Sequence, residues 1–216
     1  MKYERDSSSQ AEQESIIKTA RVRLANLGMS LERLADYKKV LDIGARDCII
    51  EKAAKSIGIN SVVSVDKNFP PDVLQSDLTV LKADAKHMDL PYECADLALI
   101  GSSAYYYSQT EAETFEILGE INRCLKKGGS QRVYPARFGH VIKCLMNEHS
   151  NFQAAKAKAM QRRTKADLGV IEQYDNQAEI LSVNFLKTKT IQVYRKEVLE
   201  PNPKGNFKHY LEIPKF

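Results

Sequence analysis

"KKVLDIGARDCII", residues 38–50, joins a short apolar run to a tight turn and then to a second apolar run. The first run predicts a buried strand and the second the start of a helix. A strand that turns into a helix just after Asp42 and Gly44 is typical of a nucleotide-binding loop. Arg46 and Cys48 occupy positions where further glycines would let the backbone approach a ligand closely.

The chain alternates between apolar strands and amphipathic helices from this segment to about residue 137. This alternation predicts a parallel sheet with helices on both faces, a three-layer α/β sandwich with a Rossmann-like sheet. Two short helices, the second capped by Ser30, are predicted between residues 15 and 37. Strands are predicted at 61–66, at 77–84 (ending at 82–83), at 95–103 and at 131–137, and helices at 47–58 and 110–129.

The C-terminal part of the chain shows the period-two pattern of strands. "TKTIQVYR" (188–195) and "KHYLEIP" (208–214) predict an antiparallel hairpin, which completes a mostly parallel sheet of seven strands. "NQAEILSVN" (176–184) is interpreted as one more helix. Residues 138–169 are predicted to be a helical cover or insertion over the ligand site. Residues 1–14 are expected to be a flexible leader, and 15–216 a single domain.

Length and composition limit the class of protein. A chain of 216 residues with 43% hydrophobic residues suits one core-bearing domain. The net charge of +4 is dispersed, which argues against a nucleic-acid partner. We expect no membrane span and a cytoplasmic location, because the N-terminus is polar and no apolar run is long enough. The four cysteines and four histidines lack the spacing of a metal site, so no metal is expected.

Polar residues follow four of the predicted strands. Right-handed crossovers bring the strand ends that carry Gly44, Asp66, Asp84 and Ser102 to one edge of a parallel sheet, where ligands bind in such folds. Each acid alone has a structural interpretation: Asp66 as part of a turn, Asp84 as a helix cap. Acids at the ends of successive strands together favour a ligand site.

These segments resemble the class I (Rossmann-like) S-adenosylmethionine-dependent methyltransferases, specifically the type 11 methyltransferase-domain group, with a degenerate glycine loop. The resemblance covers roughly residues 37–137, and it implies S-adenosylmethionine as cofactor. It also implies methyl transfer to a small molecule or a protein acceptor. The motifs that carry it are "VLDIGARDC", "SVDKN", "ADAKHMDLPYECADLALIGSS" and "EINRCLKKGG".

The resemblance also implies the residues of the cofactor site. Asp42 would face the ammonium of the cofactor. Asp66 would accept hydrogen bonds from its ribose hydroxyls, and Asp84 would accept one from the adenine amino group. Gly101 and Ser102 would line the path of the methyl group. The implied cofactor-binding residues are Asp42, Gly44, Arg46, Asp66, Lys67, Asp84, Ala85, Gly101 and Ser102.

The sequence leaves open the role of Arg46 and the identity of the catalytic group. The Arg46 guanidinium can pair with the cofactor carboxylate in a bidentate fork, which we favour, or it can fill the pocket. Tyr105 to Tyr107 can shape a substrate pocket or pack in the core, and His140 or His149 can act as a base. No catalytic residue is assigned.

Two other functions compete with the methyltransferase. One is a catalytically inactive methyltransferase-like protein that binds or scaffolds a partner through the basic region 143–165. The other, an NAD-linked Rossmann protein, is disfavoured because the loop lacks GxGxxG and because Asp42 would repel a pyrophosphate. The sequence does not assign an oligomeric state.

Overall fold

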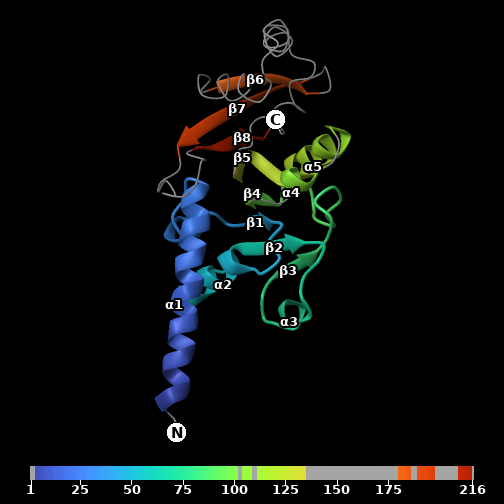
Figure 1. Ribbon diagram of the computed structural model, residues 1–216. Helices are drawn as coiled ribbons and strands as arrows, with labels where there is room; N and C mark the ends of the chain where they lie inside the picture. The colour runs from blue at the N-terminus through green and yellow to red at the C-terminus, as the bar shows by residue number, and fades with distance from the viewer. Residues whose placement is uncertain are drawn as a thin grey trace, which may run out of the picture.

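The computed structural model describes residues 3–101, 104–108, 111–134, 180–185, 189–197 and 209–215. Eight strands within these ranges form one sheet in the order β3-β2-β1-β4-β5-β8-β7-β6 (Figure 1). The strands are β1 (Val40–Ile43), β2 (Val62–Asp66), β3 (Val80–Lys82), β4 (Ala95–Gly101), β5 (Leu125–Tyr134), β6 (Ile180–Phe185), β7 (Lys189–Glu197) and β8 (His209–Pro214).

Strands β1 to β5 are parallel, and the three C-terminal strands pair antiparallel. The chain order runs outward from β1 to β2 and β3 on one side and to β4 and β5 on the other. The topological switch point therefore lies between β1 and β4, and in folds of this type ligands bind near the switch point, at the carboxyl ends of the strands. The predicted Rossmann-like α/β fold is confirmed by this order, and so is the predicted C-terminal hairpin.

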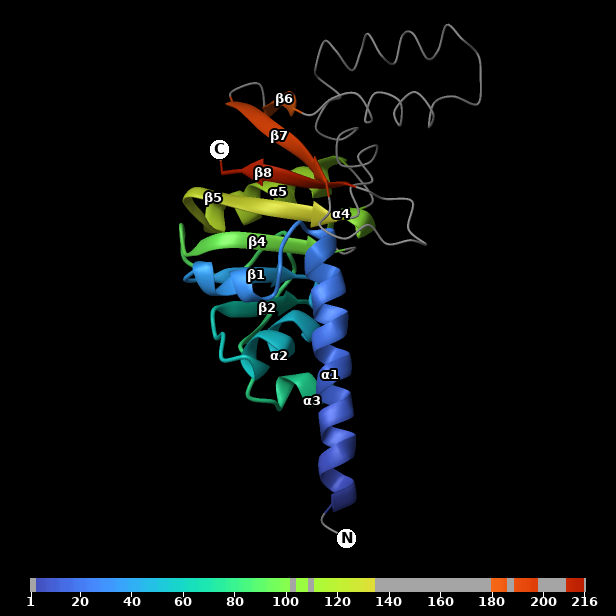
Figure 2. The same ribbon diagram turned by 90° about the vertical axis from the view of Figure 1, so that its left-hand side faces the viewer.

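Helices lie on both faces of the sheet (Figure 1). Helices α1 and α2 pack on one face and α5 on the other, and α1 runs across the strands and past the edge of the sheet (Figure 2). The helices are α1 (Tyr3–Asn26), the 3-10 helix η1 (Glu32–Asp36), α2 (Ile49–Ser56), α3 (Pro71–Leu74), α4 (Ala104–Tyr107) and α5 (Glu111–Cys124).

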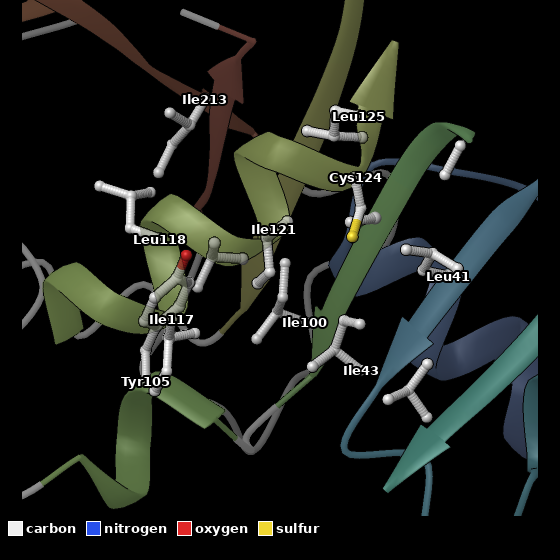
Figure 3. Close-up of a cluster of buried hydrophobic side chains, with 14 of the residues drawn as sticks. Leu41, Ile43, Ile100, Tyr105, Ile117, Leu118, Ile121, Cys124, Leu125 and Ile213 are labelled. Atoms are coloured by element: carbon white, nitrogen blue, oxygen red, sulfur yellow. The ribbon is translucent and has the colours of Figure 1, made fainter. Parts of the chain in front are cut away.

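Alternate residues of β1 belong to two different cores. Leu41 and Ile43 pack with α5, in the cluster drawn in Figure 3, whereas Val40 packs with α1 and α2. Because side chains alternate along a strand, Asp42 points to the same face as Val40. The sequence of β1 thus places a carboxylate under α1 and α2.

The predicted count of seven strands is wrong, because the described residues alone contribute eight strands to the sheet. The additional strand is β6, which overlaps the second half of the segment interpreted as a helix, "NQAEILSVN" (176–184), and ends one residue beyond it. The apolar residues Leu181, Val183 and Phe185 alternate there with Ser182 and Asn184, a period of two that favours a strand. Pairing with β7 along its whole length fixes that conformation.

The helix boundaries also differ from the prediction. The segment from residue 15 to residue 37 holds the end of one long helix, α1, and the 3-10 helix η1, whose N-cap is Leu31 rather than Ser30. Helix α1 begins within the predicted leader. The helix predicted over 110–129 ends at Cys124, because Leu125 already pairs with Ala95 of β4.

Several predictions concern residues outside the described ranges. They include the cover at 138–169, Ser102, His140 and His149, and the cover stays a prediction from the sequence. Among the helices of the described ranges, none combines the length and the apolar character that a bilayer crossing requires.

The end of α1 is fixed to the C-terminal strands by a buried arginine. The Arg132 guanidinium, on β5, donates to the carbonyl oxygens of Leu27 (3.1 Å) and Gly28 (2.8 Å). Its Cζ lies 5.4 Å from the centroid of the Tyr210 ring on β8. Gly28 has a φ of +66°, and a Cβ there would lie 2.2 Å from a carbon of that ring. The turn after α1 therefore packs against β8 only with glycine at this position.

We predict that Gly28→Ala lowers the free energy of unfolding more than Gly58→Ala. Both glycines have positive φ, which costs a residue with a Cβ about 1–2 kcal/mol. At Gly58 nothing lies within 4 Å of the added Cβ, so the positive φ is the whole energetic cost of the substitution. At Gly28 the clash with Tyr210 adds about 1–3 kcal/mol. Urea denaturation of both variants measures the difference, and equal losses would contradict the packing of this turn on β8.

Candidate functional site

The loop between β1 and α2 is bound to the end of β2 through its backbone. The Gly44 N–H donates to the carbonyl of Val65 at 2.7 Å, and the Ala45 N–H donates to the same oxygen at 3.2 Å. Gly44 has a φ of +78°, a conformation that glycine adopts without strain. The glycine of the predicted nucleotide-binding loop is thus required by the turn itself.

Arg46 and Cys48 also have positive φ, +21° and +54°. These are the two positions at which the resemblance leads one to expect glycine. A side chain in the left-handed region costs about 1–2 kcal/mol, so the loop keeps a glycine-like path at an energetic cost. The Cys48 thiol is fully buried, and this burial raises its pKa to about 11, so it stays protonated and packs as a small apolar group.

Asp66 joins the β1–α2 loop to the β2–α3 connection at the carboxyl edge of the sheet. It is the last residue of β2, and its carboxylate accepts hydrogen bonds from the N–H of Arg46 (3.1 Å) and the N–H of Asn68 (2.7 Å). One oxygen serves each donor. Asp66 therefore holds the β1–α2 loop against the β2–α3 connection.

A pocket of about 820 Å³ opens where these loops meet α4 and α5. Its walls come from the carboxyl ends of β1, β2 and β3 and from the two helices. The lining residues are Ile43, Gly44, Arg46, Val65, Asp66, Lys67, Asn68, Ala83, Asp84, Ala85, Lys86, Ala104, Ser108, Glu113 and Ile117.

Charges of both signs line the pocket. The Asp84 carboxylate accepts the N–H of Lys86 at 3.0 Å, and its other oxygen lies 4.0 Å from the Lys67 ammonium. The Lys86 ammonium lies 3.2 Å from the Glu113 carboxylate on α5. The hydrogen bond that Lys86 donates to Glu113 raises the pKa of Lys86, which keeps this lysine charged.

The structure brings most of the residues implied by the resemblance to this pocket. Of the described residues among them, Asp42 and Gly101 do not line it, and Ser102 falls outside the described ranges. Those in its walls are Gly44, Arg46, Asp66, Lys67, Asp84 and Ala85. Arg46 is exposed to solvent at the wall of the pocket.

The sequence does not indicate the wall that α4 and α5 form, or the lysine that pairs with it. Ser108 and Glu113 belong to none of the motifs that carry the resemblance, and Lys86 lies within one of them without an implied role. The crossover between β4 and β5 carries Ser108 and Glu113 to the pocket, and the sequence does not give the arrangement of this crossover.

Asp42 lies under the loop rather than in the pocket wall. It is 6% exposed on the face that α1 and α2 cover. Burial raises the pKa of its carboxyl to about 7, although the nearby Arg23 guanidinium opposes the rise. Asp42 is therefore able to change its charge near neutral pH.

Tyr105 is a core residue. Its side chain is 2% exposed and its hydroxyl donates to Oε1 of Gln131 at 2.6 Å, within the cluster of Figure 3. Burial raises the pKa of this phenol. Packing, one of the two roles considered for the tyrosines, is thus the role of Tyr105. No cluster of His, Cys, Asp and Glu within the described ranges has the arrangement of a metal site.

The chain matches no protein-family model and no curated protein sequence. Its structure is similar to those of S-adenosylmethionine-dependent methyltransferases at low identity. The N-methyltransferase NodS from Bradyrhizobium japonicum WM9, in complex with S-adenosyl-L-homocysteine, is 14% identical over 86% of this chain and 83% of NodS, with a TM-score of 0.45.

Two further similar structures come from other organisms. Human N-acetylserotonin methyltransferase, in complex with S-adenosylmethionine, is 15% identical over 95% of this chain and 54% of its own, with a TM-score of 0.49. A methyltransferase from Mesorhizobium loti is 17% identical over 47% of each chain, with a TM-score of 0.36. The chain thus spans about half the length of these two proteins. At these identities the likeness bears on the fold alone.

We predict that Asp42 makes stability depend on pH. A carboxyl whose folded-state pKa is raised contributes most stability below its unfolded pKa of about 4, and this contribution is lost as the pH rises through about 7. The wild-type free energy of unfolding should fall between pH 5 and pH 8.5, by up to about 3 kcal/mol. In Asp42→Asn this part of the fall should disappear. Urea denaturation at both pH values tests it.

Asp96→Asn is the matched control. Burial alone would raise the pKa of Asp96, but bonds from Lys126 and the Lys39 N–H lower it instead. Because its pKa is lowered from the usual range of an aspartate, Asp96 stays ionised throughout this interval, and the variant should keep the wild-type slope. Equal slopes for the wild type and Asp42→Asn would contradict the assignment to Asp42.

We predict that Arg46→Gly is more stable than Arg46→Ala by about 0.5–1 kcal/mol. Both variants remove the guanidinium, and only glycine relieves the positive φ, a gain of about 1–2 kcal/mol partly offset by the greater freedom of the unfolded glycine chain. Thermal or urea unfolding of the pair measures this. Equal stability would mean that the Arg46 backbone is not strained.

The variants Arg46→Gly and Arg46→Ala also decide between the two models for the Arg46 side chain. If the guanidinium pairs with the cofactor carboxylate, both variants bind S-adenosylhomocysteine more weakly than the wild type. If it fills the pocket, both bind more tightly. The exposed side chain at an open pocket favours the first outcome.

Proposed function

We propose that the protein is an S-adenosylmethionine-dependent methyltransferase that acts on a small molecule or a protein acceptor. The observation that carries the proposal is one pocket at the carboxyl edge of a parallel sheet, beside its switch point, with Asp66 and Asp84 in its walls and the Gly44 turn at its side. Acids at the ends of two neighbouring strands suit a ligand rich in hydroxyl and amino groups.

The residues present fit the cofactor. A pocket of about 820 Å³ is within the range of about 300–1,000 Å³ for sites that bind small molecules and cofactors. Asp66 would accept the ribose hydroxyls, and Asp84 with the Ala85 N–H would hold the adenine. At the amino-acid end, Arg46 at the wall would pair with the cofactor carboxylate, and Asp42 beneath the loop would attract the ammonium, because the charges in each pair are opposite.

S-adenosylmethionine supplies a methyl group on a positively charged sulfur, which a nucleophile displaces. Alignment and exclusion of water are the main demands of such a displacement. The loop, Asp66 and Asp84 would hold one side of the reacting pair in place. Ala104, Ile117 and the Lys86–Glu113 pair would form the opposite wall, which we assign to the acceptor.

From the sequence we further propose that the protein belongs to the type 11 group within the class I fold and that it is cytoplasmic. We also propose the three-layer arrangement of that fold, with one strand added to the seven expected. No residue is assigned as a base, because the Tyr105 hydroxyl is engaged by Gln131 and the Ser108 hydroxyl donates to the Tyr105 carbonyl at 2.8 Å.

We predict that Asp66→Ala weakens binding of S-adenosylhomocysteine by about 10–100-fold. The variant loses the proposed bonds to the ribose and the bonds to the N–H groups of Arg46 and Asn68, and a hydrogen bond to a charged group is worth about 1.5–3 kcal/mol. Isothermal titration calorimetry of wild type and variant measures the change.

Asp72→Ala is the control for Asp66→Ala. Asp72 is an exposed acid in α3, in the segment that follows Asp66, and it does not line the pocket. Its removal should leave the affinity unchanged. A wild-type protein that binds neither S-adenosylmethionine nor S-adenosylhomocysteine would overturn the proposal and favour the inactive scaffolding protein.

A further inference from the structure

Helix α1 reaches the β1–α2 loop through Arg23. The helix runs across the strands on the face that α2 shares (Figure 2). The Arg23 guanidinium makes a bidentate pair with Asp47, with Nη1 at 2.9 Å from Oδ1 and Nη2 at 2.8 Å from Oδ2. A planar fork on both oxygens of a carboxylate fixes the orientation of that carboxylate as well as its distance.

Asp47 lies at the centre of the strained part of the loop. It separates Arg46 and Cys48, the two residues with positive φ. Its Oδ1 also lies 3.4 Å from the N–H of Ile49, the first residue of α2. One carboxylate thereby links α1, the loop and the start of α2.

We propose that Arg23 is a positioning residue for the cofactor loop. Its fork on Asp47 holds Arg46 and Cys48 in the backbone path that glycines would adopt without strain. The Arg46 N–H then meets the Asp66 carboxylate at the pocket, 3.1 Å away. This inference rests on the proposed function, because the loop is assigned to the cofactor there.

The exposure of the pair indicates where its effect should appear. Arg23 and Asp47 are 45% and 47% exposed, and an ion pair this open to water contributes little to global stability. A local constraint on a loop with two strained residues acts on the loop's conformation instead. Loss of Arg23 should therefore change ligand affinity and local hydrogen exchange far more than the unfolding midpoint.

A second ion pair on the same helix provides a matched control. Arg21 lies two residues before Arg23, and its Nη2 is 2.9 Å from Oε1 of Glu32 on η1. The two side chains are 59% and 58% exposed. This pair resembles the Arg23–Asp47 pair in type, helix and exposure, but it joins α1 to η1 rather than to the loop.

The experiment compares Arg23→Gln, Asp47→Asn, the double variant and Arg21→Gln. Each is titrated with S-adenosylhomocysteine and unfolded with urea. Each single change in the Arg23–Asp47 pair should weaken binding by about tenfold, and the double variant should bind no more weakly than either single variant, because the two residues act through one interaction. Arg21→Gln should bind as the wild type does. All urea midpoints should stay close together at pH 6, where the raised pKa of Asp42 keeps its carboxyl mostly uncharged, so that the loss of Arg23 leaves no buried charge unopposed.

Hydrogen exchange of the free protein gives a readout that needs no cofactor. The Arg46 amide, bonded to Asp66, should exchange about tenfold faster in Arg23→Gln and at the wild-type rate in Arg21→Gln. Unchanged exchange at Arg46, or a double variant weakened about a hundredfold as independent effects would give, overturns the positioning role.

The two proposals fail in different ways. Wild-type protein that binds no S-adenosylhomocysteine refutes the methyltransferase function, and the Arg46 exchange rate then shows whether Arg23 still orders the loop. Wild-type binding with full affinity in Arg23→Gln refutes the positioning role alone.

Discussion

The parallel pairing of β1 with β2 on one side and β4 on the other is the constraint on which the site depends. The register aligns Ile43 with Val65 and with Ile100, so the three strands end at nearly the same level. The loop after β1 then reaches the Val65 carbonyl and the Asp66 carboxylate directly. A shift of register would move every side chain of β1 to the opposite face and would break both contacts.

The same pairing explains the unusual position of Asp42. Leu41 and Ile43 must face α5 to complete that core, so Asp42 faces the α1 and α2 side, where it is buried. A buried carboxylate is costly unless a positive charge lies near it. Arg23 is near enough to lower the pKa of Asp42 although its guanidinium is bound to Asp47. Helix α1 thus influences both acids that flank the Gly44 turn.

The sequence predicts the parallel sheet because the apolar strands and amphipathic helices of residues 38–134 follow each other with clear periods. It predicts Asp66 and Asp84 in the site because strand ends converge in any such sheet. It fails at β6, where six residues leave helix and strand ambiguous without knowledge of the β7 partner. It also misses Arg23, Lys86 and Glu113, because each acts through a contact between elements far apart in the chain, and a local pattern carries no trace of those contacts.

Replacement of glycine in a ligand loop is usually taken as a sign of lost binding, but the loop's geometry supports another interpretation. Positive φ at Arg46 and Cys48 raises the energy of the loop without preventing its conformation. Two carboxylates oppose the strain: Asp66 accepts the Arg46 N–H, and Asp47 is held by Arg23. A glycine loop is flexible and needs a ligand to order it, whereas a strained loop held by side chains is ordered in advance. The entropy lost on binding is then smaller, which offsets part of the cost of the missing glycines.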